Sequence, residues 1–300
     1  MNKVIPRIFG GLGNQLFCYA AARRMAVING AELVIDDTTG FQRDYIYKRI
    51  YQLNHFNIPC RKATPTERLE PFSRIQRRIK IFLNEPKNFL MRTYIKHNGM
   101  DFDPRILEIK PNGALYLEGH WQSEMYFKDI ENIIRSDLVI RPPEDFINIR
   151  MSSLIRKSFS SVSVHVRFFD DPSDSSNSNA PKAYYSNAIL RMESLAPNSH
   201  YFIFSDNPNA ARKLIDLPDH RITLVMHNQG EENSYADLWL MSQCKHFIIA
   251  NSTFSWWGAW LGGYKEKNII APKFILKGLT SWGFDGLIPS DWIQISCGVL

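Results

Sequence analysis

The sequence predicts an α/β protein with largely parallel sheets, and two observations support this. Short apolar segments typical of strands alternate with segments of helical periodicity, an order that favours helices layered on parallel sheets. The 300 residues, 44% of them hydrophobic, can bury the cores of about two domains. We place these domains at residues 1–150 and 151–300, with the paired prolines of VIRPPEDF, residues 139–146, as a candidate linker.

The chain opens with a predicted βαβ unit. KVIPRIF, residues 3–9, is typical of a strand, and a helix is expected from Asn14 to Asn29. Gly30 is a helix-stop signal, and AELVID, residues 31–36, is the second strand.

A glycine loop joins the first strand to this helix. Gly10, Gly11 and Gly13 expose backbone before a helix start, where the helix dipole favours a phosphate. The amides of Asn14 and Gln15 can donate to a sugar hydroxyl or a phosphate oxygen. The alternative interpretation is a tight turn capped by Asn14.

A dinucleotide-binding loop is the second alternative for this turn. Leu16 occupies the position of the third glycine in G-x-G-x-x-G, so that motif fails. Asp36 and Asp37 nevertheless lie at about the right distance along the chain to hold a ribose.

Residues 61–97 form a strongly basic segment, with ten Lys or Arg against three Glu. Five apolar residues recur in it at helical spacing, beside Arg74, Arg77, Arg78 and Lys80: Phe72, Ile75, Ile79, Phe82 and Leu83. A core-facing helix with a solvated basic back is the more common arrangement. The alternative is a peripheral contact with an anionic membrane. The segment has no nucleic-acid-reading motif, so no nucleic acid partner is expected.

The second half holds most of the strand candidates. They are SVSVHVRF, HYFIFS, RITLVM, HFIIA and NIIAP, all after residue 160. Residues 170–185 are polar and punctuated by proline, which is typical of a loop that could cover a site.

Polar residues gather at the ends of three of these strands. His165 and Arg167 share one face at the end of a strand, where open α/β sheets bind ligands. Arg167 could donate two hydrogen bonds to a diphosphate. The alternative is that the two residues form an ion pair or that His165 is a core histidine. Asp206 follows a strand and precedes Pro208, the expected first helical residue. This aspartate could accept two N–H groups of a guanine edge, or simply cap the helix.

A third strand, HFIIA, runs into ANSTFSWWGAWL. Ser252 and Thr253 at a helix N-terminus are typical of an anion site. Trp256, Trp257 and Trp260 in that helix are expected to pack in the core.

Five segments resemble a known family when taken in order: GGLGNQLFCYAAA, LEGHWQSEMYF, HVRFFDD, FIFSDNP and ANSTFSWWGAWL. They are similar to bacterial α-1,2-fucosyltransferases of glycosyltransferase family 11. The resemblance implies a GT-B-like fold of two Rossmann-like domains with a cleft between them. It also implies a GDP-β-L-fucose donor, inversion at the anomeric carbon, and no metal or other cofactor.

The resemblance also implies roles for individual residues. His165 and Asp206 would contact the guanosine, Arg167 the β-phosphate, and Ser252, Thr253 and Phe254 the phosphate side. The glycine loop, with Gly11 and Gly13, would face the sugar and acceptor, and Asn14 would orient them. The candidate base for the acceptor hydroxyl is Asp170, on the family motif's own Asp; further carboxylates available to this role are Asp36, Asp37, Asp171 and Asp174.

One residue departs from the family pattern, H-x-R-R-x-D. Phe168 replaces the second arginine. Since strand residues alternate faces, that arginine would point away from Arg167. We therefore expect weaker donor binding than in typical relatives, with activity retained.

The expected protein is a cytoplasmic galactoside α-1,2-fucosyltransferase acting on a galactose-terminated oligosaccharide or lipid-linked glycan, in O-antigen or capsule assembly. Four scattered cysteines indicate a reducing compartment, and no signal peptide or membrane span is recognisable. The location could also be peripheral, on the inner face of the plasma membrane through residues 61–97. The alternatives are a transferase for another sugar nucleotide and a non-catalytic basic interaction protein.

Overall fold

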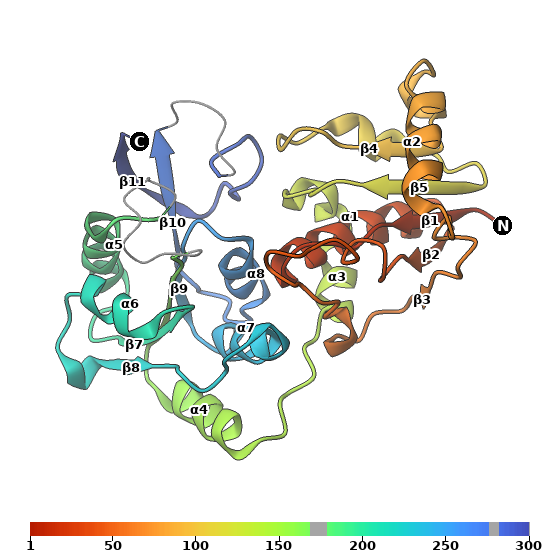
Figure 1. The fold of residues 1–300 in the computed structure, drawn as a ribbon. Coiled ribbons are helices and arrows are strands. Elements are labelled where there is room, and N and C mark those ends of the chain that lie inside the picture. The colour runs from red at the N-terminus through yellow and green to blue at the C-terminus, as the bar shows by residue number, and fades with distance from the viewer. Residues whose placement is uncertain (169–178, 276–281, 300) are drawn as a thin grey trace. The chain divides into compact units, whose positions relative to one another are not determined.

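The computed structural model describes residues 1–168, 179–275 and 282–299. The chain divides into two compact units, Met1–Arg141 with Asp285–Leu287, and Pro142–Phe284 with Ile288–Leu300 (Figure 1). The division falls within the paired-proline segment. A boundary at residue 150 would cut α4 (Phe146–Lys157), which packs against α7 (Ser234–Ser242) of the second unit.

The first unit contains a parallel sheet in the order β3-β2-β1-β5-β4. Its strands are β1 (Lys3–Pro6), β2 (Glu32–Ile35), β3 (Arg61–Lys62), β4 (Tyr94–Lys96) and β5 (Ala114–Glu118). Its α-helices are α1 (Leu12–Ile28), α2 (Ser73–Asn84) and α3 (Glu131–Asp137). Short 3₁₀ turns lie at Leu53–His55, Phe89–Met91, Pro104–Glu108, Glu124–Tyr126 and Lys128–Ile130.

The predicted βαβ unit is confirmed in β1, α1 and β2. Gly30 has a φ of 57°, the left-handed conformation in which glycine ends a helix at little cost. The helix begins at Leu12, with Gly11 as its N-cap, so Asn14 lies in the first turn. The interpretation of Asn14 as the cap of the turn is therefore wrong.

The helix predicted in the basic segment is α2, shown in orange beside β4 in Figure 1. The expectation that its apolar stripe faces the core is wrong. The five stripe residues are 52–72% exposed, whereas Arg77 is 8% exposed. Arg77 is drawn inward because its Nη2 lies 2.6 Å from Oδ2 of Asp36.

The second unit contains a parallel sheet in the order β11-β10-β9-β6-β7-β8. Its strands are β6 (Ser161–Val166), β7 (His200–Ser205), β8 (Ile222–Leu224), β9 (His246–Ile248), β10 (Ile269–Ile275) and β11 (Ile293–Val299). Besides α4 and α7, its α-helices are α5 (Lys182–Leu195), α6 (Pro208–Leu214) and α8 (Thr253–Leu261), with 3₁₀ turns at Asp219–Arg221 and Glu231–Asn233. In Figure 1, α5 and α6 lie on one face of this sheet, and α7 and α8 on the other.

The five strands expected after residue 160 are confirmed as β6 to β10, whereas β11 was not expected. The predicted loop over 170–185 lies largely outside the described residues. Its predicted end is wrong, because α5 begins at Lys182 with Pro181 as its N-cap. Trp256, Trp257 and Trp260 are at most 4% exposed, which confirms their place in the core.

Candidate active site

The predicted site residues of the second unit lie at a topological switch point. β6 and β9 are neighbours in the sheet. α5, the helix that follows β6 in the chain, lies on one face of the sheet, and α8, which follows β9, lies on the other (Figure 1). Open parallel sheets bind ligands at such a point, beyond the carboxyl ends of the strands. His165 and Arg167 lie at the end of β6, and Ser252 and Thr253 follow β9.

Arg167 is held by Asp206, which follows the adjacent strand β7. Arg167 Nη1 lies 3.1 Å from Asp206 Oδ2, and both side chains are partly exposed. The backbone N–H of Phe168 donates to Asp206 Oδ1 at 3.1 Å. The parallel register pairs Val166 with Ser205, so the two strand ends bring these residues together. The carboxylate thus fixes the guanidinium at the carboxyl ends of the strands.

Asp206 is not the cap of α6. The cap is Asn207, whose side chain accepts from the N–H of Ala210 at 3.0 Å. Pro208 is the first helical residue, as predicted. The helix-cap alternative for Asp206 is therefore wrong.

His165 is buried and uncharged at neutral pH. Burial, with a smaller contribution from the positive charge of Arg167, lowers the pKa of His165 to about 3. Its ring lies against Phe254, with ring centroids 5.5 Å apart. Its Nδ1 is buried and has no hydrogen-bond partner among the residues that the structure describes. A neutral imidazole with an open nitrogen can hydrogen-bond a ligand at this edge.

The N-terminus of α8 supplies backbone donors at the same edge. Ser252 is the N-cap, and its hydroxyl accepts from the N–H of Phe254 at 3.3 Å. Thr253 is the first helical residue. N–H groups in a first turn lack intrahelical acceptors and sit at the positive end of the helix dipole, so they suit an anion. Ser255 instead donates to the Ala250 carbonyl at 3.3 Å and is structural.

In the first unit, the glycine loop and the segment after β5 form a second switch point. β1 and β5 are neighbours, and α1 follows β1. Gly10 has a φ of 74°, and a Cβ there would lie 2.9 Å from Asn14 Nδ2, so only glycine fits. Gln122 Nε2 donates to Asn14 Oδ1 at 2.8 Å. Asn14 is thereby positioned by a residue that the sequence did not single out.

Gln15 has a structural role. It is fully buried, and its Nε2 donates to the carbonyl oxygens of Gly10 and Ile50 at 2.9 and 2.8 Å. Its Oε1 accepts from the N–H of Gln52 at 2.9 Å. These bonds fix the glycine loop, so the amide of Gln15 serves the fold.

The sequence reasoning missed two histidines that follow the carboxyl ends of β4 and β5. His120 stacks edge-on against Phe9 with centroids 5.0 Å apart, and His97 stacks on Trp121 at 5.1 Å. Burial lowers the pKa of both imidazoles. Their Nδ1 atoms have no hydrogen-bond partner within the described part of the chain. Their position just beyond β4 and β5 was the available signal, but neither strand was predicted.

The candidate base Asp170 lies outside the described residues, as do Asp171 and Asp174. Asp36 pairs with Arg77 and also accepts from the Thr39 N–H at 2.9 Å. Asp37 lies 2.8 Å from Lys62. The ion pair and its burial give Asp36 a structural role, which does not fit a base or a ribose-binding carboxylate.

Phe168 is 6% exposed. An arginine side chain there would have to leave an apolar environment or bury its charge. The phenylalanine therefore fills a buried position just after the end of β6.

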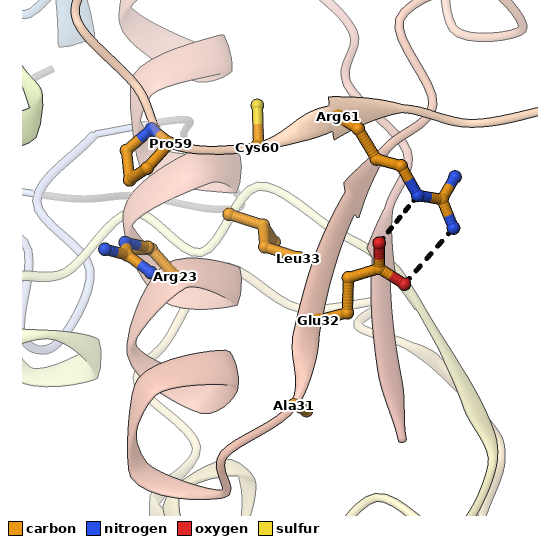
Figure 2. A pocket seen from close by; sticks show the side chains of 7 residues that line it. All are labelled: Arg23, Ala31, Glu32, Leu33, Pro59, Cys60 and Arg61. Atoms are coloured by element: carbon orange, nitrogen blue, oxygen red, sulfur yellow. Dashed lines mark hydrogen bonds and ion pairs between the residues drawn. The ribbon is translucent and has the colours of Figure 1, made fainter. Parts of the chain in front are cut away.

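A separate pocket of about 390 Å³ opens on the first unit (Figure 2). It lies by the amino ends of β2 and β3, whereas the glycine loop follows the carboxyl end of β1. Its charged groups are paired: Arg61 Nε lies 2.7 Å from Glu32, and Arg23 lies 2.7 Å from Asp137. This pocket contains none of the predicted site residues.

Two parallel α/β units, each with polar residues at a switch point, define a GT-B-like protein. The chain belongs to glycosyl transferase family 11, whose profile matches residues 51–280. It is therefore a glycosyltransferase, as the ordered motifs indicated.

Two curated relatives from Escherichia coli match nearly the whole chain. The O-antigen biosynthesis glycosyltransferase WbnK is 30% identical over 286 residues, covering 88% of this chain and 92% of WbnK. An alpha-1,2-colitosyltransferase is 29% identical over 310 residues, covering 98% of this chain and 99% of that protein.

The fold is also found among solved structures. A mutant of Arabidopsis thaliana FUT1 in complex with GDP matches with a TM-score of 0.52 and 12% identity. The match covers 89% of this chain and 70% of the plant chain. At this identity the match supports the two-unit fold alone.

Proposed function

We propose that this glycosyltransferase moves L-fucose from GDP-β-L-fucose to the 2-hydroxyl of a terminal galactose, with inversion, in O-antigen or capsule assembly. The observation that carries the proposal is the Arg167–Asp206 pair beside the N-terminus of α8. The naming of the relative WbnK for O-antigen biosynthesis supports the pathway class. The acceptor is a galactose-terminated oligosaccharide or a lipid-linked glycan.

The second unit stabilises the departing diphosphate in this proposal. Breaking the bond between the anomeric carbon and the β-phosphate oxygen leaves negative charge on GDP. A guanidinium has five N–H donors, so Arg167 can hold Asp206 and a β-phosphate oxygen together. The N-terminus of α8, at Ser252, Thr253 and Phe254, is proposed to face the phosphate side, where the positive end of the helix dipole favours negative charge. These groups supply cationic and N–H stabilisation without a metal, so we expect activity in EDTA.

His165 and Asp206 have different roles in this arrangement. The open nitrogen of neutral His165 is proposed to hydrogen-bond the guanosine. Both carboxylate oxygens of Asp206 already accept from Arg167 or Phe168. This favours Asp206 as the residue that positions Arg167, with any contact to guanine secondary.

The first unit is proposed to present the acceptor. Asn14, fixed by Gln122, orients the sugar hydroxyls, and Gly11, the N-cap of α1, allows close approach of the backbone. Gly13 is buried within α1, so the predicted contact of Gly13 with a ligand does not fit. Asp170 is proposed to take the proton of the attacking hydroxyl as the new bond to the anomeric carbon forms. Asp170→Asn should lower kcat and leave donor binding unchanged; unchanged turnover would remove Asp170 from this role.

A second donor is favoured by the colitosyltransferase relative, which matches 98% of this chain. Colitose is the 3-deoxy form of L-fucose, so the two sugars differ by one hydroxyl, and we take GDP as the carrier of both. Competition between GDP-fucose and GDP-colitose at equal concentration distinguishes them. A site that hydrogen-bonds the 3-hydroxyl would prefer fucose strongly, because the deoxy sugar leaves a buried polar group unpaired.

The first test measures GDP release from GDP-fucose with EDTA present, over a panel of galactose-terminated disaccharides. Arg167→Ala should lower kcat/KM about 10²–10³-fold, whereas Arg191→Ala, which removes an exposed arginine of α5, should leave it unchanged. Acceptor-dependent release that survives Arg167→Ala would overturn the assigned role. Release only with added divalent metal would overturn the metal-free mechanism.

A further inference from the structure

We propose that α2 docks this protein on an anionic lipid surface, with its outward apolar stripe entering the boundary between headgroups and acyl chains. The stripe consists of Phe72, Ile75, Ile79, Phe82 and Leu83. This inference uses none of the residues assigned to either switch point, so it stands independently of the proposed reaction.

The stripe is an exposed apolar surface on one helix. The exposed fractions are 65% for Phe72, 58% for Ile75, 52% for Ile79, 72% for Phe82 and 56% for Leu83. Their spacing of three and four residues places them on one side of a helix. Single exposed apolar residues are ordinary, but a contiguous row of this kind marks an interaction surface.

Polar anchors hold the stripe outward. Arg77 and Asn84 lie two helical turns apart, and both are buried on the side of α2 that faces the sheet. Arg77 pairs with Asp36 and donates to Thr39 Oγ1 at 2.6 Å. Asn84 Oδ1 accepts from the Thr93 N–H at 2.7 Å. Turning the stripe inward would break all of these bonds, so its exposure is built into the fold.

The charge around the stripe fits an anionic partner. Residues 72–96 contain seven Lys or Arg and one acidic residue, Glu85. Arg74 and Arg78 border the stripe, are exposed, and have no carboxylate in ion-pair distance among the described residues. Lys80, on the other border, lies 5.1 Å from the Tyr116 ring centroid.

This combination favours a lipid surface over a second copy of the chain. A symmetric dimer through α2 would bring the basic borders of two copies together without carboxylates to balance them. Anionic headgroups would instead neutralise the arginines while the acyl region buries the apolar side chains. In the described parts of the chain, no helix has the length and apolar character to cross a bilayer. Contact through α2 would therefore be peripheral.

The test is co-sedimentation of the full chain with vesicles. Two compositions are compared, phosphatidylcholine alone and phosphatidylcholine with about one-third phosphatidylglycerol. The protein should bind the anionic vesicles at low salt and be released in large part at high salt. Arg74→Gln with Arg78→Gln should weaken binding about five-fold per charge.

A matched pair of variants isolates the stripe. Phe82 and Leu190 are nearly equally exposed, at 72% and 70%. Phe82→Glu and Leu190→Glu therefore introduce the same negative charge at two similarly exposed sites. Phe82→Glu should weaken binding about ten-fold or more, whereas Leu190→Glu on α5 should bind like the unmodified chain. Both sites are exposed, so both variants should fold, which a thermal melt checks.

Four outcomes would overturn the proposal. They are no binding of the unmodified chain to anionic vesicles, equal binding to both compositions, equal binding of the two Glu variants, and a dimer that Phe82→Glu dissociates in the absence of lipid. The last outcome would assign the stripe to self-association.

Discussion

α8 and α2 both carry large apolar side chains at helical spacing, yet they place them in opposite environments. The three tryptophans of α8 are at most 4% exposed, whereas every stripe residue of α2 is more than half exposed. α8 packs against α7 in the interior of the second unit, while α2 contacts the sheet through Arg77 and Asn84. Apolar spacing therefore predicts that a helix has a stripe, but the polar residues between the stripe positions decide which way it faces.

The largest effect is expected from truncation in α8. Trp257→Ala should cost about 4 kcal/mol of unfolding free energy, because it leaves a cavity beside Trp256 and Trp260. Their ring centroids lie 5.0 and 5.2 Å from that of Trp257. Urea denaturation measures the loss, and a cost below about 1 kcal/mol would mean that the tryptophan cluster is not a tight core.

A smaller loss is expected when the anchor of α2 is removed. Arg77→Met leaves the buried carboxylate of Asp36 without its cation and should cost about 3 kcal/mol. Adding Asp36→Asn should recover much of that loss, because no buried charge then remains unpaired. Denaturation of the two variants side by side measures this, and equal stability of Arg77→Met and the unmodified chain would show that another contact orients α2.

We expect the stability of the protein to depend on pH through Asp237 in α7, the helix that packs on α8. Burial raises the pKa of Asp237 in α7 to about 7, against an ordinary value of 3.8. The folded chain therefore binds the carboxyl proton of Asp237 more tightly than the unfolded chain does. The stability contributed by the protonated carboxyl is complete below pH 3.8 and is lost as pH rises through 7.

Asp237→Asn should therefore raise Tm by a few degrees at pH 8 and by less at pH 5. The substituted amide oxygen can still accept from Asn228, which donates at 2.8 Å. Asp216→Asn, at an exposed site, is the control and should leave the pH dependence of Tm unchanged. The same Tm gain at both pH values would argue against ionisation as the cause.

The smallest effect on stability is expected in the stripe itself. Phe82→Ala should change the unfolding free energy by no more than about 0.5 kcal/mol, because the side chain is exposed. Denaturation in the absence of lipid measures this. A loss above about 1 kcal/mol would mean that Phe82 packs against another part of the protein and would weaken the contrast with α8.

Much of the second unit could be predicted from the sequence. Its central strands are apolar runs, so their ends located His165, Arg167, Asp206 and Ser252. The first sheet was harder, because β3 has only two residues and β4 only three, too few to show a period. The segment after β5 was consequently not recognised as a strand end, and Gln122 and His120 were missed.

By itself, the sequence determined the α/β class, the glycine turn with its helix, the order of the family motifs and the presence of an amphipathic basic helix. These depend on local periodicity, on backbone conformations that only glycine adopts readily, and on motif spacing. The tertiary structure decided which partners those residues have: Asp206 for Arg167, Gln122 for Asn14 and Asp36 for Arg77. These pairs join residues far apart in the chain, and strand order and register bring them together. A buried ion pair of this kind turned the stripe of α2 outward, a direction that helical periodicity cannot specify.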